Sequence, residues 1–517
     1  MLVQEFLEEN ARGRPEKVAL VFRGRRLTYR QLDTAANQLA HFLGARGVQR
    51  GDRVGVFMDN AVETVIAIFG ILKAGAVFSV INGSTKAEKL GYILNNARAS
   101  ALISHRRKAA VLAEALPQAP TVRCAIVAGG EPEARYGTDA VPFELALADQ
   151  PATPPPSRCI DVDLATIIYT SGSTGFPKGV MSTHLMMVTA ATSITQYLEN
   201  TPDDIILNVL PLSFDYGLYQ VLMAFKVGAT VVLEDGFAYP YRILQLLNEE
   251  RITGLPGVPT VFAMLLQLKD LATMQFPYLR YLTNTAAALP VNHIQKLRQA
   301  FPGATLYSMY GLTECKRVSY LPPAELDRRP DSVGIAIPNT EVYVVDDAGQ
   351  RVPPGVVGEL VVRGSHLMRG YWDAPAETAK VLRPGPFPNE VVLYTGDLFR
   401  MDAEGFLYFV GRKDDIIKSR GEKVSPREVE DVLCALPGVV QAAVYGLPDE
   451  VLGEAICAAV VTDGATPLTE RDVLTHCARH LESFMVPKRV EFLTCFPTTS
   501  SAKVSRRELR ERALCAV

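Results

Sequence analysis

The sequence lacks the features that define several large classes of protein. Its eight cysteines form no CxxC pair and no zinc-ligand spacing, so neither a disulfide framework nor a zinc site is predicted. The net charge is only −3, with lysine and arginine dispersed along the chain, which argues against nucleic acid or an anionic membrane as the main partner. We therefore expect reduced thiols, a cytoplasmic location and small-molecule ligands.

Long apolar runs are also missing. The longest, residues 61–81, contains Glu63 and Lys73 and is interrupted by glycines, which predicts a helix followed by a strand and no integral membrane segment. The N-terminal stretch carries acidic residues and lacks the apolar core of a secretory signal. With 517 residues, of which 48% are hydrophobic, the chain is expected to form more than one domain.

Strand and helix patterns alternate through the first part of the chain. Residues 51–58 predict a strand, 63–72 a helix and 76–81 a second strand, a succession typical of a largely parallel sheet covered on both faces. Residues 342–364 alternate as antiparallel strands do, and short strands and helices mix after residue 416. The predicted fold class is α/β: a large N-terminal domain of mixed, largely parallel sheets with a small β-rich subdomain, followed by a small α+β C-terminal domain.

The stretch YTSGSTGFPKGVM, residues 169–181, has the composition of a phosphate-binding loop. It follows an apolar strand predicted at residues 163–170, and it combines a lysine with hydroxyl side chains and with glycines that let backbone N–H groups turn toward an anion. It is not a Walker A loop, since Pro177 precedes the lysine and no serine or threonine follows it. A flexible surface linker is disfavoured, because it would need no apolar strand before it. The candidate phosphate contacts are Thr170, Ser171, Gly172, Ser173, Thr174, Gly175 and Lys178.

Four further motifs follow this loop in a fixed order. They are YGLTE (310–314), YTGD (394–397), GRKDDIIKSRGEKVSPREVE (411–430) and TSSAKVSRREL (499–509). Over nearly its whole length the chain therefore resembles the adenylate-forming superfamily, which comprises acyl-CoA synthetases, amino-acid adenylation domains and luciferases. The resemblance implies ATP and Mg²⁺ as cofactors, and CoA or a phosphopantetheine arm as the acceptor of the acyl group.

The resemblance also assigns roles to residues of these motifs. Contacts with adenine, ribose and the α-phosphate are implied for Ala286, Ala287, Ala288, Tyr310, Thr313, Asp397 and Arg412. Glu314 is the implied ligand of Mg²⁺, which prefers a single carboxylate together with phosphate oxygens and water. Lys503 is implied to approach the substrate carboxylate and the α-phosphate, where its charge would stabilise the transition state. The implied catalytic set is Lys503, Thr174, Lys178 and Glu314.

A division of the chain is implied as well. It places an N-terminal AMP-binding and acyl-pocket domain at residues 1–410, a hinge at 411–414 that pivots on Asp414, and a mobile C-terminal domain at 415–517. In the family the C-terminal domain rotates between two half-reactions, which would bring the segment around Gly421 to a tunnel for the thiol. No fused carrier is expected after this domain, so any carrier protein would be a separate chain.

Two interpretations stay open for the acyl substrate. Phe214-Asp215 resembles a pair found in amino-acid-activating members, which implies Asp215 as an anchor for an α-ammonium, but an aspartate is equally suited to cap the following helix. The segment KSRGEKVSP, residues 418–426, is closer to acyl-CoA synthetases. Further implied substrate contacts are Tyr219 and Met309.

Two cations, Lys316 and Arg317, follow Cys315 directly after the predicted metal ligand. We expect both to face solvent, as most charged runs do. The alternative is that they meet an anionic group on the substrate or on a carrier arm.

The motifs together predict an enzyme, an ATP-dependent AMP-forming acid–thiol ligase. A carboxylate would attack the α-phosphorus of Mg·ATP, and the thiol of CoA or of a carrier-protein phosphopantetheine would then displace AMP. An alternative is a stand-alone enzyme that adenylates a small or proline-like amino acid and loads a separate peptidyl carrier protein. Luciferase-like oxidation of the adenylate and a non-catalytic nucleotide sensor are more remote alternatives.

Overall fold

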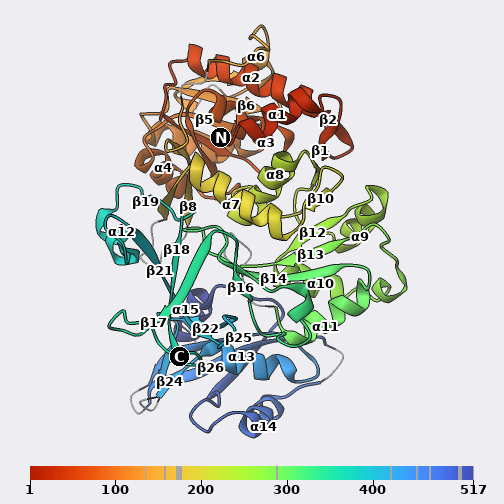
Figure 1. Ribbon diagram of the computed structural model, residues 1–517, viewed down its shortest axis with the longest axis vertical. Helices are drawn as coiled ribbons and strands as arrows, with labels where there is room; N and C mark the ends of the chain where they lie inside the picture. The colour runs from red at the N-terminus through yellow and green to blue at the C-terminus, as the bar shows by residue number, and fades with distance from the viewer. Residues whose placement is uncertain are drawn as a thin grey trace.

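The computed structural model arranges the chain in β-sheets covered by helices, with the N-terminal half and the C-terminal segment at opposite ends of the molecule (Figure 1). The residues that it describes are 1–133, 136–156, 159–170, 177–286, 289–419, 422–449, 452–464, 467–498 and 504–515.

The first large sheet has a parallel interior. In spatial order its strands are β19 (Gly370–Tyr371), β9 (Lys178–Thr183), β8 (Leu164–Thr170), β4 (Val77–Ile81), β3 (Arg53–Phe57), β5 (Ala99–His105), β6 (Cys124–Ala128) and β7 (Asp139–Pro142). All neighbours from β8 to β7 pair in parallel, whereas β9 and β19 are added antiparallel at one edge. The predicted phosphate loop therefore connects two neighbouring strands, β8 and β9.

The second large sheet repeats this design. In spatial order its strands are β16 (Ile335–Ala336), β15 (Ser319–Tyr320), β14 (Thr305–Tyr310), β13 (Tyr281–Asn284), β12 (Gly254–Gly257), β10 (Ile205–Asn208), β11 (Thr230–Leu233), β1 (Val18–Phe22) and β2 (Arg25–Thr28). Pairing is parallel from β14 to β1 and antiparallel at both edges. The hairpin of β1 and β2 closes one edge of the sheet.

Helices fill the space around the two sheets. The helices that share one core with strands of both sheets are α1 (Glu5–Gly13), α2 (Tyr29–Ala45), α3 (Val62–Lys73), α6 (Phe143–Leu147), α7 (His184–Tyr197), α8 (Asp215–Val227), α9 (Pro240–Glu249), α10 (Pro259–Leu266) and α11 (Val291–Ala300). Val54 and Val56 of β3 point into this core, while Phe57 joins a second core on the other face under α4 (Ala87–Asn96) and α5 (Ala109–Ala115). The alternation follows from the two-residue period of a strand.

Local signals explain where several helices begin and how the apolar run folds. Thr28 caps α2 in a capping box with Gln31. The run at residues 61–81 forms α3 and β4, as predicted. Lys73 within it is buried because its Nζ pairs with Glu8 and Asp33 at 2.6 and 2.9 Å. In the described part of the chain no helix is long and apolar enough to cross a membrane.

A smaller β-rich unit follows the second large sheet. Its strands are β17 (Thr340–Val345), β18 (Val357–Gly364), β20 (Leu382–Pro384), β21 (Val391–Met401) and β22 (Leu407–Arg412), all paired antiparallel as predicted. Helix α12 (Pro375–Val381) lies beside it and packs on β19 and β21.

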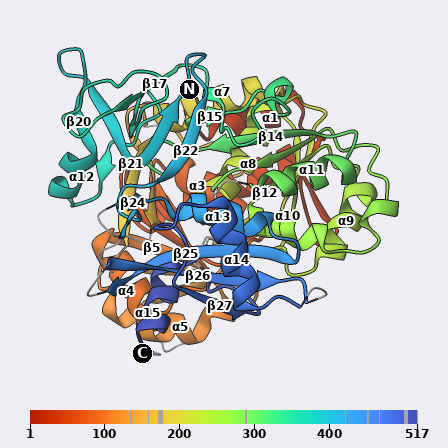
Figure 2. The ribbon, with the colours of Figure 1, turned by 90° about the horizontal axis from the view of Figure 1, so that it is seen from below.

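The C-terminal segment has its own sheet and two small cores. Its strands are β23 (Ile417–Ser419), β24 (Glu422–Val424), β25 (Val439–Asp449), β26 (Gly453–Thr462) and β27 (Arg489–Leu493), covered by α13 (Pro426–Ala435), α14 (Glu470–His480) and α15 (Arg506–Cys515). Figure 2 shows α13 and α14 side by side on this sheet. The fold class predicted from the sequence is thus confirmed.

Candidate active site

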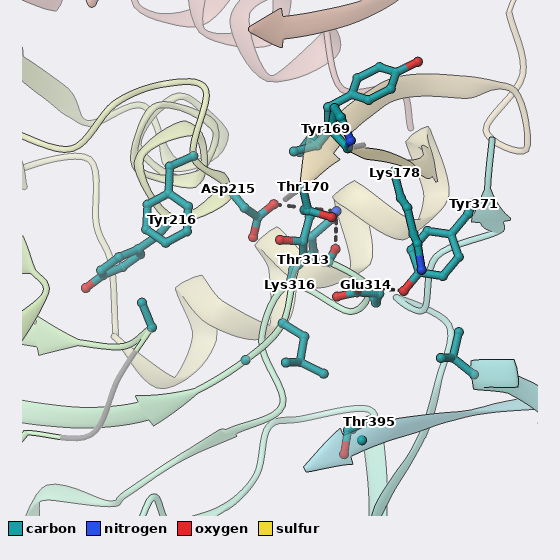
Figure 3. Close-up of a pocket in the computed structure, with 18 of the residues that line it drawn as sticks. Tyr169, Thr170, Lys178, Asp215, Tyr216, Thr313, Glu314, Lys316, Tyr371 and Thr395 are labelled. Carbon is teal, nitrogen blue, oxygen red and sulfur yellow. Dashed lines mark hydrogen bonds and ion pairs between the residues drawn. The ribbon is translucent and has the colours of Figure 1, made fainter. Parts of the chain in front are cut away.

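A cavity of about 770 Å³ opens where the ends of β8 and β9, the loop after β14 and the middle of β21 meet the start of α8 (Figure 3). Such crevices beyond the carboxyl ends of parallel strands are common ligand sites in α/β proteins. Predicted site residues that line it are Thr170, Lys178, Phe214, Asp215, Ala286, Thr313, Glu314, Arg412 and Asp414. Other predicted residues lie outside the described ranges: Ser171, Gly172, Ser173, Thr174, Gly175, Ala287, Ala288, Gly421 and Lys503.

Lys178 opens β9 opposite Thr170 of β8. Its Nζ lies 2.7 Å from Glu377 Oε2 on α12 and 5.5 Å from the centre of the Tyr371 ring. Hydrogen bonds from Lys178 and then Lys380 lower the pKa of Glu377 to about 2. The phosphate-loop lysine is therefore held at the cavity wall by a carboxylate on another element, a contact that the sequence motifs did not indicate.

Glu314 is positioned by an aromatic side chain from a distant part of the chain. Tyr371 of β19 donates its hydroxyl to Glu314 Oε1 at 2.8 Å, and Figure 3 shows the carboxylate turned toward that ring. Burial, together with the charge of Glu314, raises the pKa of Tyr371. The bond leaves the second carboxylate oxygen for a metal ion. A single carboxylate at a nucleotide pocket fits the preference of Mg²⁺.

Three residues predicted to contact the nucleoside are brought together beside the cavity. Tyr310 donates its hydroxyl to Asp397 Oδ2, and Arg412 Nε lies 3.3 Å from Asp397 Oδ1. Asp397 and Arg412 face each other because they are register partners on β21 and β22. Ala286, with a φ of 76°, also lines the cavity.

Lys316 and Arg317 do not face solvent, so that prediction is wrong. They are only 2% and 3% exposed. The loop after β14 folds back on itself, and Gly311 permits this because a Cβ there would lie 2.3 Å from the Lys316 carbonyl oxygen. Lys316 Nζ donates to the Thr313 carbonyl at 2.8 Å and lies 3.6 Å from Asp215 Oδ1, an arrangement visible in Figure 3.

Asp215 is the first residue of α8 and follows its N-cap, Phe214. Among the described residues its carboxylate makes no capping hydrogen bond, although a negative charge in the first turn suits the helix dipole. Burial raises the pKa of Asp215, while Lys316 and Arg317 oppose that rise. Its partner in this structure is Lys316.

The other two predicted substrate contacts do not line the cavity. Tyr219 lies one turn further along α8, fully buried. Met309 lies in β14, where its sulfur accepts the hydroxyl of Tyr197 at 2.9 Å. Their part in binding the acid therefore stays a prediction. Tyr216, Thr285 and Arg317 line the cavity instead.

The matches to known families agree with this geometry. The family model described as AMP-binding enzyme matches residues 7–372, and the model described as AMP-binding enzyme C-terminal domain matches residues 428–503. The chain belongs to the AMP-binding, adenylate-forming family of enzymes. The prediction of an AMP-forming ligase of this superfamily is confirmed.

The chain is similar to two kinds of protein: much longer synthases, of which it spans a small part, and CoA ligases, which it spans almost in full. The chain is 31% identical to tyrocidine synthase 3 of Brevibacillus parabrevis over 98% of its own length, but it spans only 8% of that protein. It is 30% identical to the long-chain-fatty-acid–CoA ligase of Bacillus subtilis over 98% of its own length and 94% of the ligase.

Solved structures of similar fold match the whole chain. The anthranilate CoA ligase AuaEII in complex with anthranoyl-AMP is 29% identical with a TM-score of 0.92, and the match covers 100% of this chain and 98% of that ligase. ATP-bound MatB from Rhodopseudomonas palustris is 28% identical with a TM-score of 0.87, and the match covers 99% of each chain.

Proposed function

We propose that this protein activates a carboxylic acid with ATP as an acyl-adenylate and then transfers the acyl group to the thiol of CoA. The observation that carries the proposal is one cavity lined by Lys178, Thr313, Glu314 and Arg412 and also by the buried Asp215. It provides cationic and hydroxyl groups for a triphosphate at one end and room for an acid at the other.

The first half-reaction needs no nucleophile from the protein. The carboxylate of the substrate is already anionic, so the chain has to align it with the α-phosphorus and neutralise the charge that develops there. Lys178 would exchange Glu377 for a phosphate oxygen. Thr313 and the predicted Lys503 would act on the α-phosphate. Glu314, held by Tyr371, would bind Mg²⁺, which when bound neutralises phosphate charge.

The second half-reaction needs a thiol. CoA is proposed because the relative that this chain spans almost in full is a CoA ligase. The division into residues 1–410, a hinge at 411–414 and a mobile segment at 415–517 belongs to this proposal, with Asp414 as the pivot. The position of Asp414 on the cavity wall supports it, because a pivot there would move the C-terminal segment relative to the bound adenylate.

The test is acid-dependent release of pyrophosphate from Mg·ATP, followed by detection of the thioester by mass spectrometry after CoA is added. We expect pyrophosphate release that requires both the acid and Mg²⁺, and we expect a CoA thioester as the final product. A carrier protein bearing phosphopantetheine is assayed in parallel, and acylation of the carrier without any CoA thioester would replace CoA as the acceptor. No pyrophosphate with any acid would refute the proposed function.

A further inference from the structure

The acyl end of the cavity is built around three buried charges. Asp215, Lys316 and Arg317 are 5%, 2% and 3% exposed, and all three line the cavity. Burying a charge without a partner is costly. The way in which these charges are paired therefore indicates what else the pocket is built to hold.

Asp215 already has a cationic partner. Lys316 Nζ lies 3.6 Å from its Oδ1 and is itself anchored by the Thr313 carbonyl at 2.8 Å. A substrate ammonium beside Asp215 would add a third cation next to Lys316 and Arg317, with only one carboxylate between them. Like charges that close in a low-dielectric site repel. The pocket floor therefore disfavours an amino-acid ammonium.

Arg317 has no such partner. Among the described residues no carboxylate forms an ion pair with it, and its Nε has no hydrogen-bond acceptor. The guanidinium lies 4.9 Å from the centre of the Tyr216 ring, and Nη1 donates to the Lys316 carbonyl at 3.1 Å. These contacts fix its position, and its charge is balanced only through Asp215, a carboxylate that it shares with Lys316. Glu314 also lines the cavity, but its carboxylate is turned to Tyr371.

A buried hydroxyl of the same cavity also lacks a partner. Thr285 is 2% exposed, lines the same cavity, and its Oγ1 makes no hydrogen bond in the described part of the chain. Buried polar groups are normally satisfied. A cation and a hydroxyl that are both short of acceptors form a site for an acidic oxygen.

The described lining of the cavity contains no residue of α9, α10 or α11. These helices share the core that covers the second sheet. The described lining therefore favours a short acid over a long alkyl chain.

We propose that the acid activated by this enzyme is short and carries a second anionic group, a dicarboxylate being the simplest case, whose distal carboxylate is bound by Arg317 and Thr285. The inference rests on the proposed function and specifies its substrate class. Arg317 recognises a carboxylate better than a lysine would, since its planar fork can donate two parallel hydrogen bonds.

The experiment compares length-matched acids in the pyrophosphate assay: succinate, glutarate and adipate against butanoate, pentanoate and hexanoate, with γ-aminobutyrate and proline as ammonium-bearing acids. We expect one diacid to exceed its matched monoacid in kcat/KM by roughly ten- to a hundredfold, the worth of one charged hydrogen-bond pair. Arg317→Gln should abolish that preference by raising KM for the diacid far more than KM for the matched monoacid. Arg317→Lys should restore part of it.

Controls separate this inference from the proposed function. Arg369→Gln removes an exposed arginine that does not belong to the described lining of the cavity, and it should change nothing. Thermal stabilisation by Mg·ATP reports that each variant is folded. If monoacids or amino acids release pyrophosphate with a kcat/KM equal to or higher than that of the matched diacid, the inference is wrong. The proposed function would still hold in that case. If no acid causes pyrophosphate release and no diacid raises the melting temperature, both the inference and the proposed function are wrong.

Discussion

The buried pair of Asp215 and Lys316 makes a stability prediction that can be worked from the structure. Lys316→Met would leave the Asp215 carboxylate in the interior without its nearest cation, and breaking a buried pair by removing one partner costs about 3–5 kcal/mol. The separation of 3.6 Å and the nearby Arg317 charge put this case at the low end. We therefore expect a loss of about 3 kcal/mol at pH 7.5, and a melting temperature lower by roughly 3 °C.

A double-mutant cycle tests this prediction. Asp215→Leu with Lys316→Met removes both charges, and a buried ion pair can often be replaced by apolar residues without loss of stability. The double variant should therefore melt above the Lys316→Met single variant. The matched control is Arg298→Met, which breaks an ion pair with Asp327 whose side chains are 46% and 76% exposed, and should cost below about 1 kcal/mol. Additive single losses, or a Lys316 loss no larger than the Arg298 loss, would refute the reasoning.

Three further predictions concern other contacts. His184 accepts the backbone N–H of Val3 at 3.1 Å, and burial lowers its pKa to about 4. The neutral imidazole therefore contributes about 3 kcal/mol of stability above pH 6.5, and this contribution is lost as the pH falls toward 4. In the His184→Gln variant the melting temperature should depend less on pH over this range. An unchanged dependence of the melting temperature on pH would contradict the role given to His184. Glu377→Gln should tighten ATP binding up to about fivefold in low salt and less in high salt, because Lys178 would no longer have to leave a partly exposed carboxylate. Weaker ATP binding of this variant in calorimetry would show instead that Glu377 positions the lysine. Lys503→Ala should lower the rate of acid-dependent pyrophosphate release by at least about a hundredfold and change the Kd for ATP by no more than a few-fold. A normal rate of pyrophosphate release would show that Lys503 has no part in the mechanism.

The order of the motifs was enough to predict the class of fold and the nucleotide end of the site. The alternation of strand and helix before residue 130 predicted parallel sheets, since each apolar segment needs a partner on both faces. Thr28 marked the start of α2 through its capping chemistry. Tyr310, Asp397 and Arg412 come from three separate motifs and lie together in the structure. Local periodicity and motif chemistry carry this information because each of them is a property of short stretches of chain.

The acyl end of the site was decided by contacts between residues far apart in the sequence. Lys316 and Arg317 have the composition of an exposed charged run, but the turn at Gly311 buries them beneath Asp215, about a hundred residues earlier in the chain. Tyr371 and Glu377 reach Glu314 and Lys178 through pairing that brings β19 onto the edge of the first sheet. The sequence by itself determined the family and the class of fold. Only the tertiary structure decided which charges pair, because pairing depends on distance and burial between elements, and neither is a property of a local stretch.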